Sequence, residues 1–300
     1  NPVTGEPYEP NEVLAGDFGR AIAEFWADGP TSETPPGHWN VVANQVVDDL
    51  PELRQAGEGP ELDPLEYDVK LYLALNGAVH DAAVAAWGAK RSYDYARPIS
   101  MIRYMGELGQ SSDPAGPAFH PDGLPLEDGL VEVVTTESSE PGGRHERLAD
   151  HVGEVAVRTW LGTPDDLETQ VGGVGWKRAV EWVPYQLSTF VTPAFAGYVS
   201  GHSTFSRAAA EVLTAITGSP YFPGGMGEWT VPAGSLEFEA GPTTDVVLQW
   251  ASYVDAADQA GHSRLYGGIH PPADDFPGRE IGAQVGQAAW AKALELYRLA

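Results

Sequence analysis

Glycine and proline gather in clusters that divide this chain into short helical segments. The sequence contains 35 Gly and 25 Pro; Pro removes a backbone hydrogen bond from a helix, and Gly weakens a helix by its conformational freedom. Loops are therefore expected at 2–10, 29–37, 57–64, 111–125, 137–143, 220–227 and 232–242. The periodicity of apolar residues predicts helices at 11–28, 65–90, 143–161, 175–190, 203–217, 244–262 and 278–299. Brief alternation predicts strands only at 131–135 and 235–239.

These segments predict an all-α fold, in which the helices pack as a bundle and long loops lie at their ends. The chain has 300 residues, which is long enough to bury a sizeable core. We expect residues 1–61 to form an N-terminal arm with helices that pack on the core. Residues 62–300 are expected to form the main helical domain, and the two parts together one compact unit.

The charge balance excludes several classes of function. There are 17 Lys and Arg residues against 43 Asp and Glu, which gives a formal net charge of -26. Such a field repels nucleic acids and anionic membrane surfaces, so neither is expected as a partner. The chain has no Cys, which excludes disulfides and thiolate chemistry. An acidic sequence that begins at Asn1, without a signal peptide, is typical of the mature form of a secreted or periplasmic protein.

Three short segments carry residues suited to holding one tetrahedral oxyanion. The first contains Lys90 and Arg97, which are seven residues apart. Seven residues make two helical turns, so both cations project from one face if the helix continues to Pro98. By itself this spacing is more often a solvated pair of charges.

The second segment is Ser200-Gly201-His202, which runs directly into an expected helix. The start of a helix offers backbone N–H groups that have no partner within the helix, and these bind anions. Here they are joined by a hydroxyl and an imidazole. Taken alone, the segment is more often an ordinary helix N-cap.

The third segment contains Arg264, His270 and Asp274. Arg264 offers a two-pronged donor for an oxyanion, and His270 offers a ring nitrogen as a ligand or nucleophile. Asp274 is expected to orient His270 through the other ring nitrogen. A single His in such a position is otherwise most often a loop or core residue.

Together and in this order, the segments read Lys-x6-Arg-Pro, Ser-Gly-His and Ser-Arg-x5-His-x3-Asp. The pattern resembles the signature of the superfamily shared by vanadium-dependent haloperoxidases and type 2 phosphatidic acid phosphatases. The matched span runs from Lys90 to Asp274, and Val199 replaces the Pro that usually precedes Ser-Gly-His. The resemblance implies a helical bundle of the vanadium haloperoxidase or acid phosphatase type.

The resemblance also implies an activity, that of a vanadate-dependent haloperoxidase. Such a peroxidase uses hydrogen peroxide to oxidise chloride, bromide or iodide to hypohalous acid, and a small organic acceptor is a further partner. Vanadate is the implied cofactor, held by His270, with His202 as the acid–base group and Lys90 polarising the peroxide. The residues implied to hold the anion are Lys90, Arg97, Ser200, Gly201, His202, Arg264 and His270. A homo-oligomer, a dimer or larger, is expected because members of this family associate through apolar helical surfaces.

Two aromatic residues indicate which branch of the family the chain resembles. Trp87 lies three residues before Lys90, and Phe195 lies five before Ser200. Chloroperoxidase-type members have Trp and Phe at these places, near the halide, whereas bromoperoxidase-type members tend to have His in place of Phe195. The chain therefore resembles bacterial chloroperoxidases. The alternative is that both rings are core residues.

Two other functions use the same residues. Phosphate and vanadate are near isosteres, so phosphate fits the same site. A phosphatase, a phosphoric monoester hydrolase with His270 as the nucleophile that forms a phosphohistidine, is the first alternative. A catalytically silent scaffold or assembly subunit is the second, and the intact set of anion-site residues argues against it.

Further acidic and histidine residues lie outside the signature. His145 and His151 flank Glu146 and Asp150, but their spacing does not converge on a metal ion, and a solvated face is favoured. By resemblance, the upstream carboxylate of Asp28 is a candidate partner for an active-site Arg.

Overall fold

The computed structural model describes residues 1–27, 29 and 32–298; Asp28 lies outside the described residues. The chain folds as two compact units. The first, called the helical unit here, consists of Asn1–Tyr95, Phe195–Leu236 and Gly241–Ala300. The second, called the sheet unit, consists of Ala96–Ala194 and Glu237–Ala240.

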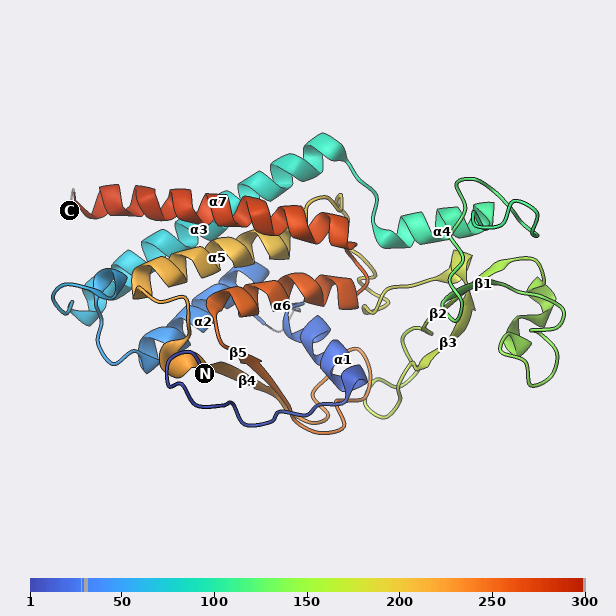
Figure 1. Cartoon of the computed structure of the whole chain (residues 1–300), viewed down its shortest axis with the longest axis horizontal. Helices are drawn as coiled ribbons and strands as arrows, with labels where there is room; N and C mark the ends of the chain where they lie inside the picture. The colour runs from blue at the N-terminus through green and yellow to red at the C-terminus, as the bar shows by residue number, and fades with distance from the viewer. Residues whose placement is uncertain (28, 30–31, 299–300) are drawn as a thin grey trace. The chain divides into compact units, whose positions relative to one another are not determined.

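The helical unit contains six of the α-helices and a β-hairpin (Figure 1). Its helices are α1 (Ala15–Phe25), α2 (Pro35–Asp49), α3 (Pro64–Tyr93), α5 (Gly201–Thr217), α6 (Tyr253–Tyr266) and α7 (Pro272–Tyr297). Two 3-10 turns, η1 (Gln55–Gly57) and η4 (Pro223–Gly225), lie between them. The hairpin pairs β4 (Gly227–Val231) with β5 (Val246–Trp250) in antiparallel fashion.

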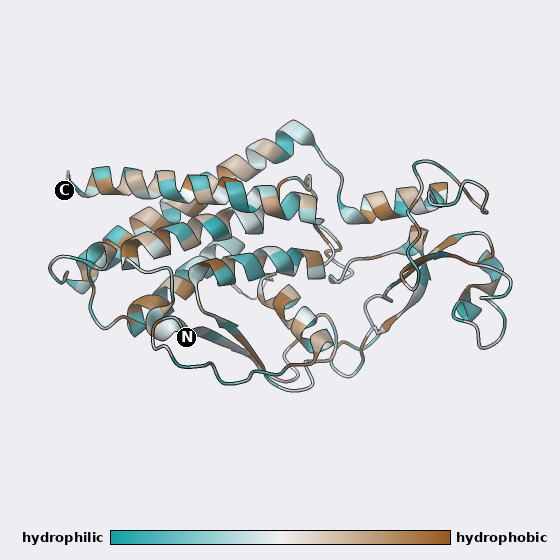
Figure 2. Cartoon of the chain, viewed as in Figure 1, coloured by the Kyte–Doolittle hydropathy of each residue, from teal (hydrophilic) through white to brown (hydrophobic). Residues whose placement is uncertain are grey.

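Helix α5 is the central helix of this unit and packs against α3, α6 and α7. Many of its small and branched residues are fully buried, among them Ala208, Ala209 and Leu213. The core continues through Trp26, which follows α1, and through aromatic residues of α2 and β5, including Trp39 and Trp250. Figure 2 shows that α6 and α7 carry hydrophobic and hydrophilic residues side by side along their lengths, as expected for helices with one buried side.

Three glycines bring α7 and α5 into direct backbone contact. Gly278, Gly282 and Gly286 are four residues apart and therefore share one face of α7. A Cβ atom at Gly282 would lie 2.2 Å from the carbonyl oxygen of Thr204, and one at Gly286 would lie 2.7 Å from that of Ala208. No larger side chain fits between the two helices. This contact holds the segment that carries His270 against the beginning of α5.

The sheet unit combines α4 (Pro98–Leu108) with a three-stranded antiparallel sheet (Figure 1). The strands β1 (Val131–Val133), β2 (Val155–Trp160) and β3 (Val174–Arg178) have the order β1-β2-β3. The 3-10 turns η2 (Glu146–His151) and η3 (Ala179–Glu181) complete the unit. A small core forms where Val155 and Val157 of β2 pack with Leu124 and Ala179.

The fold is mainly helical, as expected, but it is not all-α. The expected helices at 143–161 and 175–190 are wrong, because these stretches contain strands β2 and β3. The expected helix at 244–262 begins only at Tyr253, and residues 246–250 form a strand whose buried residues alternate. The strand expected at 235–239 does not form, whereas the one at 131–135 does. Short apolar runs fit either period, and pairing with distant segments decided for strands.

Helices α1 and α2, which lie within residues 1–61, pack into the core of the helical unit. The division expected at residue 61 stays a prediction. Among the described residues, no helix combines the length and the apolar character that crossing a membrane requires.

Candidate oxyanion site

A buried His–Asp pair lies at the beginning of α7. The Nδ1 atom of His270 lies 2.7 Å from Oδ2 of Asp274, and both side chains are almost completely buried. A carboxylate only accepts hydrogen bonds, so Nδ1 carries a proton and the ring orientation is held. His270 lies just before the extended N-cap residue Pro271, and Asp274 lies in the first turn of α7, which begins at Pro272.

The first turn of α5 meets this pair. The backbone N–H of Ser200 donates to the carbonyl oxygen of Asp274 at 2.9 Å. Ser200 is the N-cap of α5, and its Oγ accepts from the N–H of Ser203 at 3.3 Å. The positive end of the helix dipole therefore lies against Asp274, the partner of His270, and such a helix end favours a bound anion.

Gly201 and His202 are the first two residues of α5. A Cβ atom at Gly201 would lie 3.0 Å from the ring of Trp87, so a side chain at this position would displace the indole. The ring of His202 is partly buried and lies 5.1 Å from that of Phe205, centroid to centroid. Because Gly201 has no side chain, the Trp87 ring can lie directly against the backbone at the start of α5.

Lys90 is a buried cation near the end of α3 and is only 3% exposed. Its Nζ donates to the carbonyl oxygens of Ala196 and Gly197, at 2.9 and 2.8 Å. Nζ also lies 5.6 Å from the ring centroid of Trp87 and 5.3 Å from that of Phe195. The two carbonyls and two rings hold the ammonium in the loop that leads to Ser200.

Trp87 and Phe195 contact each other, with ring centroids 5.1 Å apart. Each is 44% exposed. The alternative that they are core aromatics is therefore wrong. They form a half-exposed aromatic pair beside Lys90.

Arg264 lies in the last turn of α6 and is buried. Its Nη2 donates to the carbonyl oxygen of Ala23 in α1 at 2.8 Å, and its Nε contacts the Ser263 hydroxyl at 2.9 Å. The carbonyl oxygen of Arg264 in turn accepts from the N–H of Ile269, the residue before His270. This bond ties the end of α6 to the turn that carries the histidine.

The structure thus connects six of the seven expected anion-site residues within the helical unit. Direct contacts link the start of α5 to Asp274 and Trp87, and through them to His270 and Lys90. Arg97 is the N-cap residue of α4 and belongs to the sheet unit. Its place in the anion site stays a prediction from the sequence.

Sequence reasoning missed two groups that shape this site. Asp275 and Ser203 form a buried hydrogen bond of 2.6 Å between α7 and α5. The glycines of α7 bring the same two helices together. The repeat of glycine at every fourth residue from 278 to 286 is a signal of close helix contact that the sequence does contain.

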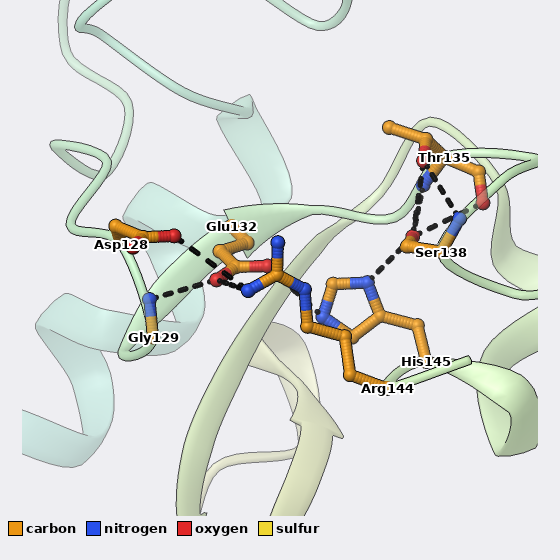
Figure 3. Close-up of polar contacts among 7 residues, drawn as sticks. All are labelled: Asp128, Gly129, Glu132, Thr135, Ser138, Arg144 and His145. Carbon is orange, nitrogen blue, oxygen red and sulfur yellow. Dashed lines mark hydrogen bonds and ion pairs between the residues drawn. The ribbon is translucent and has the colours of Figure 1, made fainter. Parts of the chain in front are cut away.

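A separate polar cluster surrounds His145 in the sheet unit (Figure 3). Its ring is fully buried; Nδ1 lies 2.9 Å from the Ser138 hydroxyl, and Nε2 lies 3.5 Å from Oε2 of Glu132. Arg144 pairs with Glu132 at 2.9 Å, and Trp176 meets the imidazole edge-on. The expected solvated face is therefore wrong for His145. Among the described residues, no three acidic or histidine side chains gather as metal ligands.

The burial of His145 predicts that the protein loses stability in acid. Burial lowers the pKa of His145, Arg144 lowers it further, and Glu132 opposes both. The unfolded chain therefore binds a proton, with an ordinary pKa near 6.5, before the folded chain does. We expect the free energy of unfolding to fall as the pH drops below that value, and His145→Gln to flatten this dependence in denaturant titrations between pH 5 and 7. His80→Gln, which removes an exposed histidine, is the control; an equal slope in wild type and His145→Gln would contradict the prediction.

Comparison with known proteins identifies the family and the fold. The model of the family described as VCPO second helical-bundle domain matches residues 70–298. Crystal structures of a holo-type and an apo-type bacterial vanadium-dependent chloroperoxidase both resemble the chain with a TM-score of 0.60, at 18% and 19% identity. The alignments cover 93% of this chain and 44% and 45% of theirs.

A third structure, described as the first bacterial vanadium-dependent iodoperoxidase, resembles the chain with a TM-score of 0.50 and 19% identity. That alignment covers 92% of this chain and 43% of the other. The chain spans less than half the length of these proteins, and at such identities the likeness shows the fold. A comparison with curated protein sequences found no match. Because the family model covers most of the sequence, from α3 to the end of α7, the chain belongs to the family of VCPO second helical-bundle domains.

Proposed function

We propose that this chain carries the oxyanion site of a vanadate-dependent haloperoxidase. The observation that carries the proposal is the buried His270–Asp274 pair, placed by a backbone hydrogen bond against the first turn of α5. This arrangement joins an imidazole of fixed orientation to the anion-binding end of a helix. The structural neighbours are described as vanadium-dependent enzymes, which supports the same assignment.

The residues present fit vanadate or another tetrahedral oxyanion. Two buried cations, Lys90 and Arg264, lie in a chain whose net charge is -26. Gly201 lets the Trp87 ring pack closely against the start of α5, since a Cβ there would lie 3.0 Å from the ring. Hydrogen-bond donors and positive charge are the groups that an oxyanion requires, and a dry site strengthens both.

Each residue has a proposed task. His270 binds the oxyanion through Nε2, and Asp274 keeps the proton on Nδ1. His202 takes and returns a proton at the second position of α5, and Lys90 supplies positive charge from a position held by two carbonyls. Vanadate, when bound, would act as a Lewis acid that activates hydrogen peroxide toward a halide. We retain Arg97 as a further anion ligand on the strength of the sequence motif.

The aromatic pair favours a halide over a bulky phosphate ester. Trp87 and Phe195 surround the Lys90 ammonium from two sides with apolar rings. Apolar rings exclude water, which suits a small, weakly hydrated anion beside the cation better than a strongly hydrated phosphate ester. A phosphatase with His270 as nucleophile would use the same donors, so this alternative is decided by assay.

The test begins with the protein stripped of bound anion. Equilibrium dialysis measures the uptake of vanadate, and paired assays then follow two reactions on the same preparation. One is halogenation of a cyclic diketone with hydrogen peroxide and chloride or bromide; the other is hydrolysis of a nitrophenyl phosphate. We expect uptake near one vanadate per chain and halogenation that depends on it. Phosphate release without halogenation would replace the proposal by a phosphatase, and no uptake would overturn it.

A further inference from the structure

A second buried carboxylate, Asp275, lies directly after Asp274 and takes no part in the tasks described so far. Its side chain has no exposed surface. Oδ1 accepts from the Ser203 hydroxyl at 2.6 Å and from Nε of Arg279 at 2.9 Å, and Oδ2 accepts from Nη2 of Arg279 at 2.6 Å. A Cβ atom at Gly261 of α6 would lie 2.4 Å from Oδ1, so α6 also encloses the group.

The position of Asp275 connects the two halves of the candidate site. The preceding residue, Asp274, orients His270 from the beginning of α7. Its hydrogen-bond partner, Ser203, directly follows His202 in the first turn of α5. One turn of α7 thus holds the histidine on one side and the anion-binding end of α5 on the other.

The charge of Asp275 creates an electrostatic problem for such a site. Ser203, which contacts this buried carboxylate, lies in the first turn of α5, where the oxyanion is proposed to bind. The carboxylate is therefore within roughly 10 Å of the proposed anion. At that distance in protein, two like charges weaken binding by roughly tenfold. Arg279 offsets the negative charge of Asp275 by donating two hydrogen bonds to its carboxylate. The Arg279 guanidinium also pairs with Asp258 at 2.8 Å.

We infer that the Asp275–Arg279 pair is a positioning device for the oxyanion site, in which Asp275 holds the first turn of α5 through Ser203 and Arg279 cancels its charge. The inference rests on the proposed oxyanion site. It assigns Asp275 no contact with the anion, since its two oxygens are engaged by Ser203 and Arg279. A merely structural ion pair would not make anion affinity depend on the sign of the charge that remains.

That dependence is the test. Vanadate and inorganic phosphate are titrated by equilibrium dialysis into three anion-free variants: Arg279→Met, Asp275→Asn and the double variant. We expect Arg279→Met to lower the affinity for both anions by roughly tenfold, because the buried negative charge of Asp275 stays near the site. Asp275→Asn keeps an oxygen that can accept from the Ser203 hydroxyl and removes one negative charge, while Arg279 stays paired with Asp258, so its affinity should equal or exceed that of the wild type. The double variant removes one charge of each sign and so keeps the net charge of the wild type; its affinity should return to within about threefold of the wild type.

Two controls separate this effect from loss of structure. Arg207→Met removes an arginine of α5 that pairs with Glu211 at 2.8 Å, and it should leave anion affinity unchanged. Arg279→Lys keeps the charge without the fork and should retain most of the affinity. Thermal melting of each variant reports folding independently of the anion.

The outcomes distinguish the inference from the proposed function. If the wild type binds the anions but all three variants lower the affinity equally, or if no variant changes it, the positioning role is wrong while the oxyanion site stands. If the wild type binds neither anion, the site itself is wrong and the inference is lost with it. Opposite responses of the two single variants, with recovery in the double variant, would establish the device.

Discussion

Replacing His270 by alanine is expected to abolish both the uptake of vanadate and halogenation. His270 is the proposed ligand, and it is buried against Asp274, so no neighbouring side chain replaces it. Asp274→Asn should have a smaller effect, a loss of about 10- to 100-fold in affinity, because it removes the carboxylate that orients the ring. Equilibrium dialysis and the halogenation rate on the same preparations measure both effects.

His202→Ala is the matched comparison for this prediction. His202 is the second residue of α5, and its ring packs near Phe205. We assign it a proton-transfer task. We expect weaker but measurable uptake of vanadate, with turnover lower by roughly 10²- to 10⁴-fold. Full vanadate-dependent activity in His270→Ala would show that the ligand assignment is wrong. Equal loss of anion in both variants would remove the distinction between ligand and acid–base group.

Gly282→Val is expected to destabilise the helical unit and to disable the site with it. A Cβ atom at this position would lie 2.2 Å from the Thr204 carbonyl oxygen and 2.9 Å from Cβ of Arg207. Helix α7 must therefore move away from α5, at an expected cost of about 3 kcal/mol from overpacking. Calorimetry or circular dichroism should show a fall in Tm of several degrees, and anion uptake should fall because His270 and Ser200 separate.

The control is a glycine with open space around it. Gly77 lies inside α3 and is exposed, and a Cβ atom at this position would meet no neighbouring atom of the described residues within 4 Å. Gly77→Ala should stabilise the chain by roughly 0.5–1 kcal/mol, since alanine favours a helix and limits the unfolded state. A Gly282→Val protein that melts and binds anion like the wild type would contradict the view that direct helix contact frames the site.

The sequence alone predicted the parts of the site that depend on local geometry. His270 and Asp274 are close in sequence, on either side of the Pro pair that starts α7, so their contact involves only a short segment of the chain. Ser200 and Gly201 precede an apolar helix, which suffices to predict an N-terminus with unpaired donors. The signature also predicted the family, which the family model confirms.

Other features depend on segments that are far apart in the chain. Residues 155–160 are apolar enough for a helix or a strand, and hydrogen bonds to β1 and β3 made them a strand. The contact of Trp87 with Gly201 and the bond from Ser203 to Asp275 each join different helices. Spacing along the chain reports only what lies within a few turns. Contacts between helices are decided by which side chains fit together when the core closes, and only the tertiary structure contains that information.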